Sequence, residues 1–188
     1  MAIEPHDIIA ANELARVRES YASKGRYYHT WVHVEALLAS ARRDGMMLTP
    51  VVLAIIYHDI VYNASAKDNE ARSAKALEAA RENGHFTASA NDVAEAATMI
   101  NLGEGTPAVD WFWDADREIL AADDAAYDAY AGAVRKEYSI YPDFMYKRGR
   151  AAFVKAELAR PHIYRTPSFR ARFDDRARAN LSRELARL

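Results

Sequence analysis

The chain has 188 residues, with 25 Lys and Arg against 27 Asp and Glu, and no cysteine. This length suits one domain that closes a hydrophobic core without cross-links. The lack of cysteine excludes disulfides, thiolate metal sites, iron–sulfur clusters and a cysteine nucleophile, so a bound metal would need imidazole and carboxylate ligands. The formal charge of -2 argues against generic nucleic-acid binding through phosphate contacts and favours a small partner.

The first fifteen residues, MAIEPHDIIAANELA, contain three carboxylates and no long apolar run. We therefore expect neither a signal peptide nor a membrane span, and a cytoplasmic location.

The sequence pattern is helical nearly throughout. Ala-rich segments with apolar residues three and four positions apart recur, whereas alternating β-branched runs are nearly absent. We expect an all-α protein with one bundle of about eight or nine helices over residues 1–188. The expected helices run over 7–22, 30–44, 49–62, 68–84, 88–101, 112–121, 123–139, 142–159 and 167–187.

Start and stop signals support these boundaries. Thr49-Pro50 and Thr166-Pro167 each offer an N-cap followed by proline at the first helical position, and Asp68 precedes an Ala-rich run. Breaks are expected at Gly45, Gly84, 103–107 and Pro161.

Two histidines are the first candidate metal ligands along the chain. In RYYHTWVHVEALL, residues 26–38, His29 and His33 stand four residues apart and share a helix face if the helix has begun by Thr30. This spacing suits metal ligands, and it equally suits two histidines with backbone partners.

The pair His58-Asp59 closes the apolar run VVLAIIY at 51–57. An imidazole and a carboxylate are costly to bury unless they are hydrogen-bonded, paired or coordinating, and a divalent cation would account for both. Because neighbouring residues on a helix diverge by about 100°, both reach one ion only in a crevice between helices that supplies further ligands. Asp114 and Asp116, within WFWDADREIL at 111–120, are the candidate carboxylates.

The order His33, His58-Asp59, Asp116 resembles the H…HD…D signature of the HD superfamily of metal-dependent phosphohydrolases. The stretches RYYHTWVH, LAIIYHDIVYN, DNEARSA, DADREIL, VRKEY, IYRTP and ARANLSREL also resemble, in order, a subgroup of small bacterial predicted HD-type phosphohydrolases. The resemblance covers nearly the whole chain. It implies that His33, His58, Asp59 and Asp116 bind one divalent ion. Asp116 is preferred over Asp114 because the family's last ligand typically precedes a basic residue and a helix.

The motif DNEARSA at 68–74 follows the HD dipeptide by a short loop. Many two-metal HD enzymes place a histidine here, and Asn69 stands at the matching position, which favours one metal over two. Glu70 is a candidate general base for the attacking water. The alternative is that Asp68 is an N-cap and Glu70 a first-turn carboxylate favoured by the helix dipole.

The remaining roles are assigned by proximity in sequence. Asp59 is expected to hydrogen-bond the attacking water while it coordinates the metal ion. His29 is expected to contact the substrate phosphate, to hydrogen-bond a ligand residue, to act as a spare ligand or to cap the helix start. The candidate phosphate-binding side chains, each by default a solvated surface charge, are Arg26, Lys67, Arg72 and Arg117.

The resulting hypothesis is metal-dependent hydrolysis of a phosphate ester, with a nucleotide among the candidate substrates. A site of imidazoles and carboxylates suits Mn, Fe, Co, Ni, Zn or Mg in different degrees. The alternative is a non-catalytic helical module in which the metal is structural or the pocket binds a phosphorylated ligand. A homodimer is left open.

Overall fold

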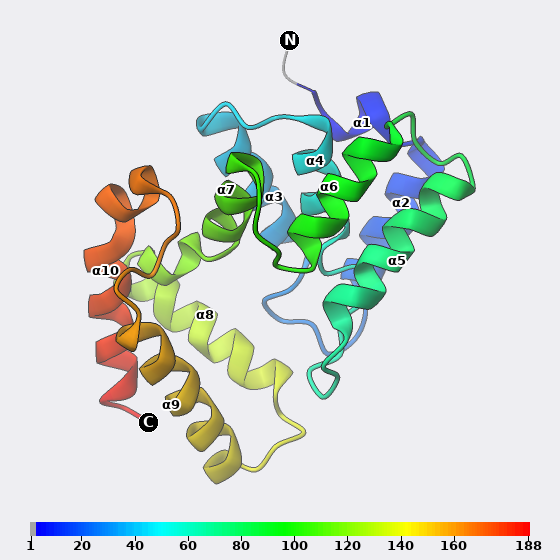
Figure 1. Ribbon diagram of the computed structural model, residues 1–188. Helices are drawn as coiled ribbons and strands as arrows, with labels where there is room; N and C mark the ends of the chain where they lie inside the picture. Colours follow the sequence, from blue (N-terminus) through cyan, green and yellow to red (C-terminus); the bar gives the residue numbers. More distant parts are fainter. Residues whose placement is uncertain (1–2) are drawn as a thin grey trace. The chain divides into compact units, whose positions relative to one another are not determined.

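The structure is a computed structural model that describes residues 3–188. Within that range the protein is all-helical, as predicted, and contains no β-strand; a single bridge pairs Ile9 with Phe86. The chain divides into two compact units, 1–115 and 116–188 (Figure 1). None of the described helices is both long enough and apolar enough to cross a membrane.

The first unit contains seven helices. They are α1 (Pro5–Ile8), α2 (Ala11–Tyr21), α3 (Trp31–Arg43), α4 (Thr49–Tyr57), α5 (Asn69–Glu82), α6 (Ala90–Ile100) and α7 (Pro107–Asp116), the last residue of which begins the second unit.

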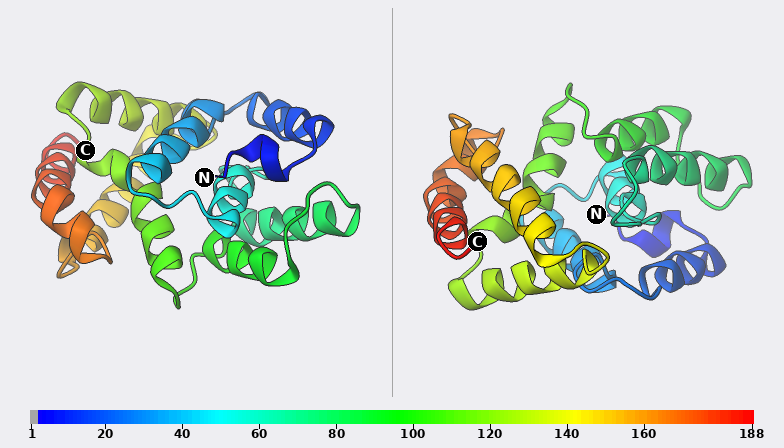
Figure 2. Two further views of the ribbon diagram at one scale, coloured as in Figure 1. Left: turned by 90° about the horizontal axis from the view of Figure 1, so that it is seen from above. Right: turned by 90° about the horizontal axis from the view of Figure 1, so that it is seen from below.

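Helix α4 is the centre of the first unit. Every residue from Pro50 to Tyr57 is buried, and α4 packs against α1, α3, α5 and α6. Helices α5 and α6 also pack together and lie side by side in Figures 1 and 2. A nine-residue helix enclosed on all sides needs no polar face, which explains why TPVVLAIIY is apolar almost throughout.

The second unit contains the short 3-10 helix η1 (Glu118–Ala121), α8 (Asp124–Glu137), α9 (Asp143–Ala159) and α10 (Pro167–Leu185). Helix α10 packs against η1 and α9. It begins as predicted, with the Thr166 side chain accepting a hydrogen bond from the Phe169 N–H and Pro167 at the first helical position.

Three predicted helices were wrong in their extent. The expected helix 7–22 is two helices, because the helix is interrupted at Ile9 and Ala10. Ile9 forms a β-bridge with Phe86, and the Ala10 N–H donates to the His85 carbonyl. The expected helix 112–121 begins five residues earlier, at Pro107, and ends at Asp116. The third error, at the end of α4, affects the candidate site.

Candidate metal centre

Three predicted ligands meet in the first unit. One ligand atom each from His33, His58 and Asp59 lies within 4.8 Å of the others, and this is the metal-type cluster found among residues 3–188. His33 Nε2 stands 3.1 Å from His58 Nε2, and His58 Nε2 stands 3.0 Å from Asp59 Oδ2. Both histidines are buried, while Asp59 is partly exposed. The cluster therefore has one side open to an incoming ligand.

His33 is delivered by the first turn of α3. The helix begins at Trp31, with Thr30 at the N-cap position, so His33 is its third residue and its N–H bonds to the Thr30 carbonyl. His33, Val34 and Leu37 are all buried, which places the imidazole on the face that α3 turns toward the core.

The end of α4 brings His58 and Asp59 together. The predicted helix 49–62 was too long: α4 ends at Tyr57, and His58 is its C-cap, still with helical φ and ψ of -56° and -38°. The Asp59 carboxylate nevertheless lies against the imidazole of the preceding residue, with Oδ2 3.0 Å from His58 Nε2.

Side chains from the α2–α3 region stabilise this helix end, where no Gly or Pro stands. The Tyr21 hydroxyl donates to the Ile56 carbonyl and accepts from the Asp59 N–H. The Arg26 guanidinium donates to the carbonyls of Asp59 at 2.7 Å and Ile60 at 3.0 Å. These contacts satisfy backbone groups that a helix end leaves open.

Arg26 also ties the two ligand-bearing segments to each other. The Nη1 group that donates to Asp59 also donates to the His29 carbonyl at 3.0 Å, and the guanidinium lies over the rings of Tyr21 and Tyr62. Arg26 was predicted to bind phosphate. Its guanidinium donates to three backbone carbonyls of the site and, from Nε, to the Ser23 hydroxyl, and these hydrogen bonds position the site.

The protonation of His58 follows from its neighbours. Nδ1 lies 3.0 Å from the Ile55 carbonyl, which can only accept, so Nδ1 carries a proton. In the neutral ring Nε2 then presents a lone pair toward His33 Nε2 and Asp59 Oδ2. A lone pair facing a carboxylate oxygen at 3.0 Å requires a cation between them, either a proton on Nε2 or a metal ion.

The Asp59 carboxylate is strongly held in its ionised form. Burial acts to raise its pKa, but the imidazoles of His58, His29 and His33 outweigh burial and hold that pKa well below its usual range. Ionised Asp59 is the form that a cation requires as a ligand.

His29 lies beside the cluster but outside α3. It precedes Trp31 by two residues, so the predicted shared helix face does not exist, yet its ring centroid stands 6.1 Å from that of His33. The His29 ring stacks on Tyr62 at 4.4 Å between centroids, and Tyr28 packs against both imidazoles. His29 thus helps to form an aromatic wall next to the ligands.

The DNEARSA segment opens α5. Asp68 occupies the N-cap position, although its side chain accepts no capping hydrogen bond, and Glu70 is an exposed first-turn residue. The Asn69 side chain accepts from the Asn63 N–H and donates to the Asn63 carbonyl, which closes the loop after the HD pair. Both hydrogen bonds of the Asn69 amide are therefore made within this loop.

The other predicted phosphate-binding residues are divided between the two units. Lys67 and Arg72 are exposed in the first unit. Arg117 belongs to the second unit, where it forms an ion pair with Glu157, and burial lowers its pKa.

The two candidate carboxylates of α7 differ in environment. Asp114 is completely buried, whereas Asp116 is partly exposed at the last residue of the helix. Phe112 contacts the His58 ring edge-on at 5.8 Å, so α7 passes beside the cluster. Asp116 follows Phe112 by four residues and so shares its helix face, whereas Asp114 does not. The fourth ligand stays a prediction.

Sequence reasoning missed Tyr21, and it assigned Arg26 to phosphate and not to the backbone of the site. Both precede the ligands by only a few residues, but their partners are backbone groups more than thirty residues away, and no spacing rule reports such contacts. No protein-family model, curated protein or solved structure matches this chain.

Proposed function

We propose that the protein binds one divalent metal ion through His33, His58 and Asp59 and hydrolyses a phosphate ester beside it, as the resemblance to HD-type phosphohydrolases implies. The observation that carries this proposal is the convergence of His33 Nε2, His58 Nε2 and Asp59 Oδ2 while the Ile55 carbonyl occupies His58 Nδ1.

The distances suit a common metal ion. Two ligand atoms each about 2.1 Å from an ion stand about 3.0 to 3.4 Å apart for angles of about 90° to 109°. The observed separations are 3.1 Å between the two Nε2 atoms and 3.0 Å between His58 Nε2 and Asp59 Oδ2.

A proton fits the cluster less well than a metal ion does. One proton on His58 Nε2 can point at Asp59 or at His33, whereas a metal ion accepts all three lone pairs at once. The His58–Ile55 hydrogen bond is also the usual outer-shell contact that sets the tautomer of a metal-ligating histidine.

A bound divalent ion would lower the pKa of a water and neutralise a phosphoryl oxygen. The ionised Asp59 carboxylate would accept a hydrogen bond from that water. Exposed Glu70 is the candidate to take its proton, and the stacked rings of His29 and Tyr62 offer a surface for a substrate's planar group. Arg26 holds the backbone of Asp59 and His29, while Lys67, Arg72 and Arg117 are the candidates to meet phosphate charge.

Asp116 is the proposed fourth ligand. Its support is the family-like order His33, His58-Asp59, Asp116 together with its place one turn beyond Phe112 on α7. Separate substitution of Asp114 and Asp116 by alanine, read by bound metal per chain, tests this choice: loss in Asp116→Ala alone supports it, and loss in Asp114→Ala alone reverses it.

A non-catalytic metal- or phosphate-binding module would keep the same ligands. The exposure of Glu70 and its position outside the metal-type cluster fit such a module as well as an enzyme. Turnover is the property that separates the two.

The test loads the purified protein in turn with Mn, Fe, Co, Ni, Zn and Mg and measures phosphate release from nucleotides, sugar phosphates and an aryl phosphate. We expect Asp59→Ala to lose metal and activity together. We expect Glu70→Gln to keep the metal and lose activity, and the exposed neighbour variant Lys75→Gln to keep both. A wild-type protein that holds its ion tightly and releases no phosphate would establish the module, and one that binds no ion would overturn the site itself.

A further inference from the structure

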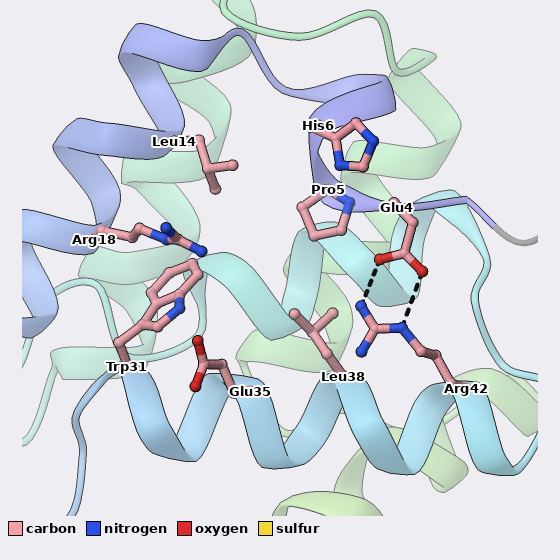
Figure 3. Close-up of a pocket in the computed structure, with 9 residues that line it drawn as sticks. All are labelled: Glu4, Pro5, His6, Leu14, Arg18, Trp31, Glu35, Leu38 and Arg42. Atoms are coloured by element: carbon pink, nitrogen blue, oxygen red, sulfur yellow. Dashed lines mark hydrogen bonds and ion pairs between the residues drawn. The ribbon is translucent and has the colours of Figure 1, made fainter.

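A cavity apart from the metal cluster lies among α1, α2 and α3. Its volume is about 400 Å³, near the small end of the range of about 300 to 1,000 Å³ typical of small-molecule sites. Figure 3 shows Arg18, Trp31 and Glu35 on one side, Glu4 and Arg42 on the other, and apolar side chains between them. None of the metal-centre residues lines it.

On one side of this cavity the two charged side chains, Glu4 and Arg42, are paired with each other. Arg42 Nε and Nη2 donate to the two carboxylate oxygens of Glu4 at 2.9 Å and 2.5 Å. The Arg42 guanidinium also holds the pKa of Glu4 below its usual range, so both groups are charged and mutually paired. This side offers little net charge to a ligand.

The opposite side has one charge of each sign without an ion-pair partner in the described chain. Arg18 lies over the ring of Trp31, with its guanidinium carbon 4.7 Å from the ring centroid. Glu35 follows Trp31 by one turn of α3. Both are exposed, and within residues 3–188 neither enters an ion pair.

Trp31 separates these two charges, and its buried indole N–H lacks a hydrogen-bond acceptor in the described structure. In Figure 3 the nitrogen is on the ring edge that faces Glu35, yet no hydrogen bond joins them. A buried N–H without an acceptor is unfavourable, so an acceptor from outside the chain is expected.

We propose that this cavity binds a small zwitterion that carries one carboxylate and one ammonium group, which is the chemistry of a free amino acid. The carboxylate accepts from Arg18 and from the Trp31 indole N–H, and the ammonium group pairs with Glu35. Leu14 and Leu38 supply apolar surface for a short side chain. The proposal is independent of the metal centre.

The indole N–H signal reports binding directly. The chain has three Trp, so a nitrogen-15 spectrum contains three indole signals, and the one missing in Trp31→Phe belongs to Trp31. Glycine, L-leucine, L-glutamate and L-lysine are titrated into the full chain at millimolar concentration. We expect at least one to shift the Trp31 signal saturably, while acetate and methylammonium, each carrying half of the chemistry, do not.

Matched variants assign the contacts. Arg18→Gln and Glu35→Gln should each weaken binding at least about tenfold, as expected for loss of a charged hydrogen bond. Glu19→Gln, an exposed change on the same helix as Arg18, should leave it unchanged. Calorimetric titration of the same amino acids gives the affinities if a variant broadens the spectrum.

Three results overturn the proposal. The first is that none of the amino acids shifts the Trp31 signal saturably. The second is that acetate shifts it as strongly as the amino acids, which defines an anion site. The third is that Glu35→Gln moves the signal without any ligand while titrations stay flat, which identifies Glu35 as the partner of the indole.

Discussion

Each unit contains one buried cluster of charged or ionisable side chains, and the two clusters offset the free-energy cost of burying charge in different ways. In the second unit, Arg150 donates to Glu184 from Nε at 2.8 Å and from Nη2 at 3.0 Å, and Tyr127 donates to the same carboxylate. In the first unit, His33, His58 and Asp59 bring three ligand atoms to one point.

The difference lies in the balance of donors and acceptors. The Arg150–Glu184 cluster supplies its own cation, and its hydrogen bonds are complete within the protein. The His33–His58–Asp59 cluster places acceptors around His58 Nε2, while His58 Nδ1 already donates to the Ile55 carbonyl. A self-sufficient ion pair indicates a structural role, whereas converging lone pairs indicate a site for an added cation.

The largest expected effect comes from breaking the self-sufficient cluster. Arg150→Met leaves Glu184 buried without its cation and should destabilise the protein by about 3 to 5 kcal/mol in urea unfolding, with metal content unchanged. Removal of both charges in Arg150→Met/Glu184→Leu should recover much of this loss, because no charge then stays buried. A loss below about 1 kcal/mol in the single variant would mean that the pair is not a structural element.

The metal cluster should respond to the added ion instead. At a free metal concentration about one hundred times Kd, the wild type should gain about 2.7 kcal/mol in unfolding free energy. Asp59→Asn should lose this gain, and Glu70→Gln should keep it. The comparison between clusters fails if Asp59→Asn is stabilised by metal as much as the wild type.

Arg26 has a structural role within the metal site, because its guanidinium holds the backbone that carries the ligands. Arg26→Lys should weaken metal binding about 10- to 100-fold, as loss of an outer-shell contact does, because one ammonium cannot bridge the carbonyls of His29, Asp59 and Ile60. The readout is a competition titration against a metal chelator, with exposed Lys24→Gln as control. Equal affinity in Arg26→Lys and wild type would leave Arg26 with no positioning role.

Much of the fold was predictable because the helical signals are local. The periodicity, the Thr166-Pro167 start and the apolar run of α4 depend only on neighbouring residues, and the all-α class is confirmed. The end of α4 was not predictable in this way. Tyr21 and Arg26 stabilise that end from a distant segment of the chain. Because the local pattern contains no stop signal there, it predicted a helix that continues to residue 62.

The same contrast applies to the candidate site. His33, His58 and Asp59 were found from residue type and order, and the structure brings them together. The condition for a shared helix face of His29 and His33, a helix begun by Thr30, is not met because α3 begins at Trp31. The two buried networks built on Glu13 and Glu184 were not predicted, since no local pattern reports the contacts that reach these carboxylates from other helices, namely those of Tyr57, Arg150 and Tyr127.

The smallest predicted effect concerns Glu13, a nearly fully buried carboxylate in the unit that also holds the metal cluster. Arg16 donates to both of its oxygens, and the Tyr57 hydroxyl donates to one at 2.6 Å. Burial acts to raise the pKa of Glu13, but these donors and the nearby His85 outweigh burial and lower it. This network is another self-sufficient one, and it holds the last residue of α4.

Because the pKa of Glu13 is lower in the folded than in the unfolded protein, its contribution to stability is full above the ordinary value of about 4.3. Below that value the unfolded chain takes up the proton first, so the contribution falls until the folded pKa is passed. Glu13→Gln lacks this proton uptake. Between about pH 5 and pH 3 its unfolding free energy should therefore decline less than that of the wild type, by about 1 kcal/mol, while exposed Glu19→Gln should follow the wild type. Urea unfolding at successive pH values measures the difference. Parallel curves for Glu13→Gln and wild type would show that the ionised network adds nothing to stability, and would leave the Arg150–Glu184 cluster as the one buried pair of the comparison that acts structurally.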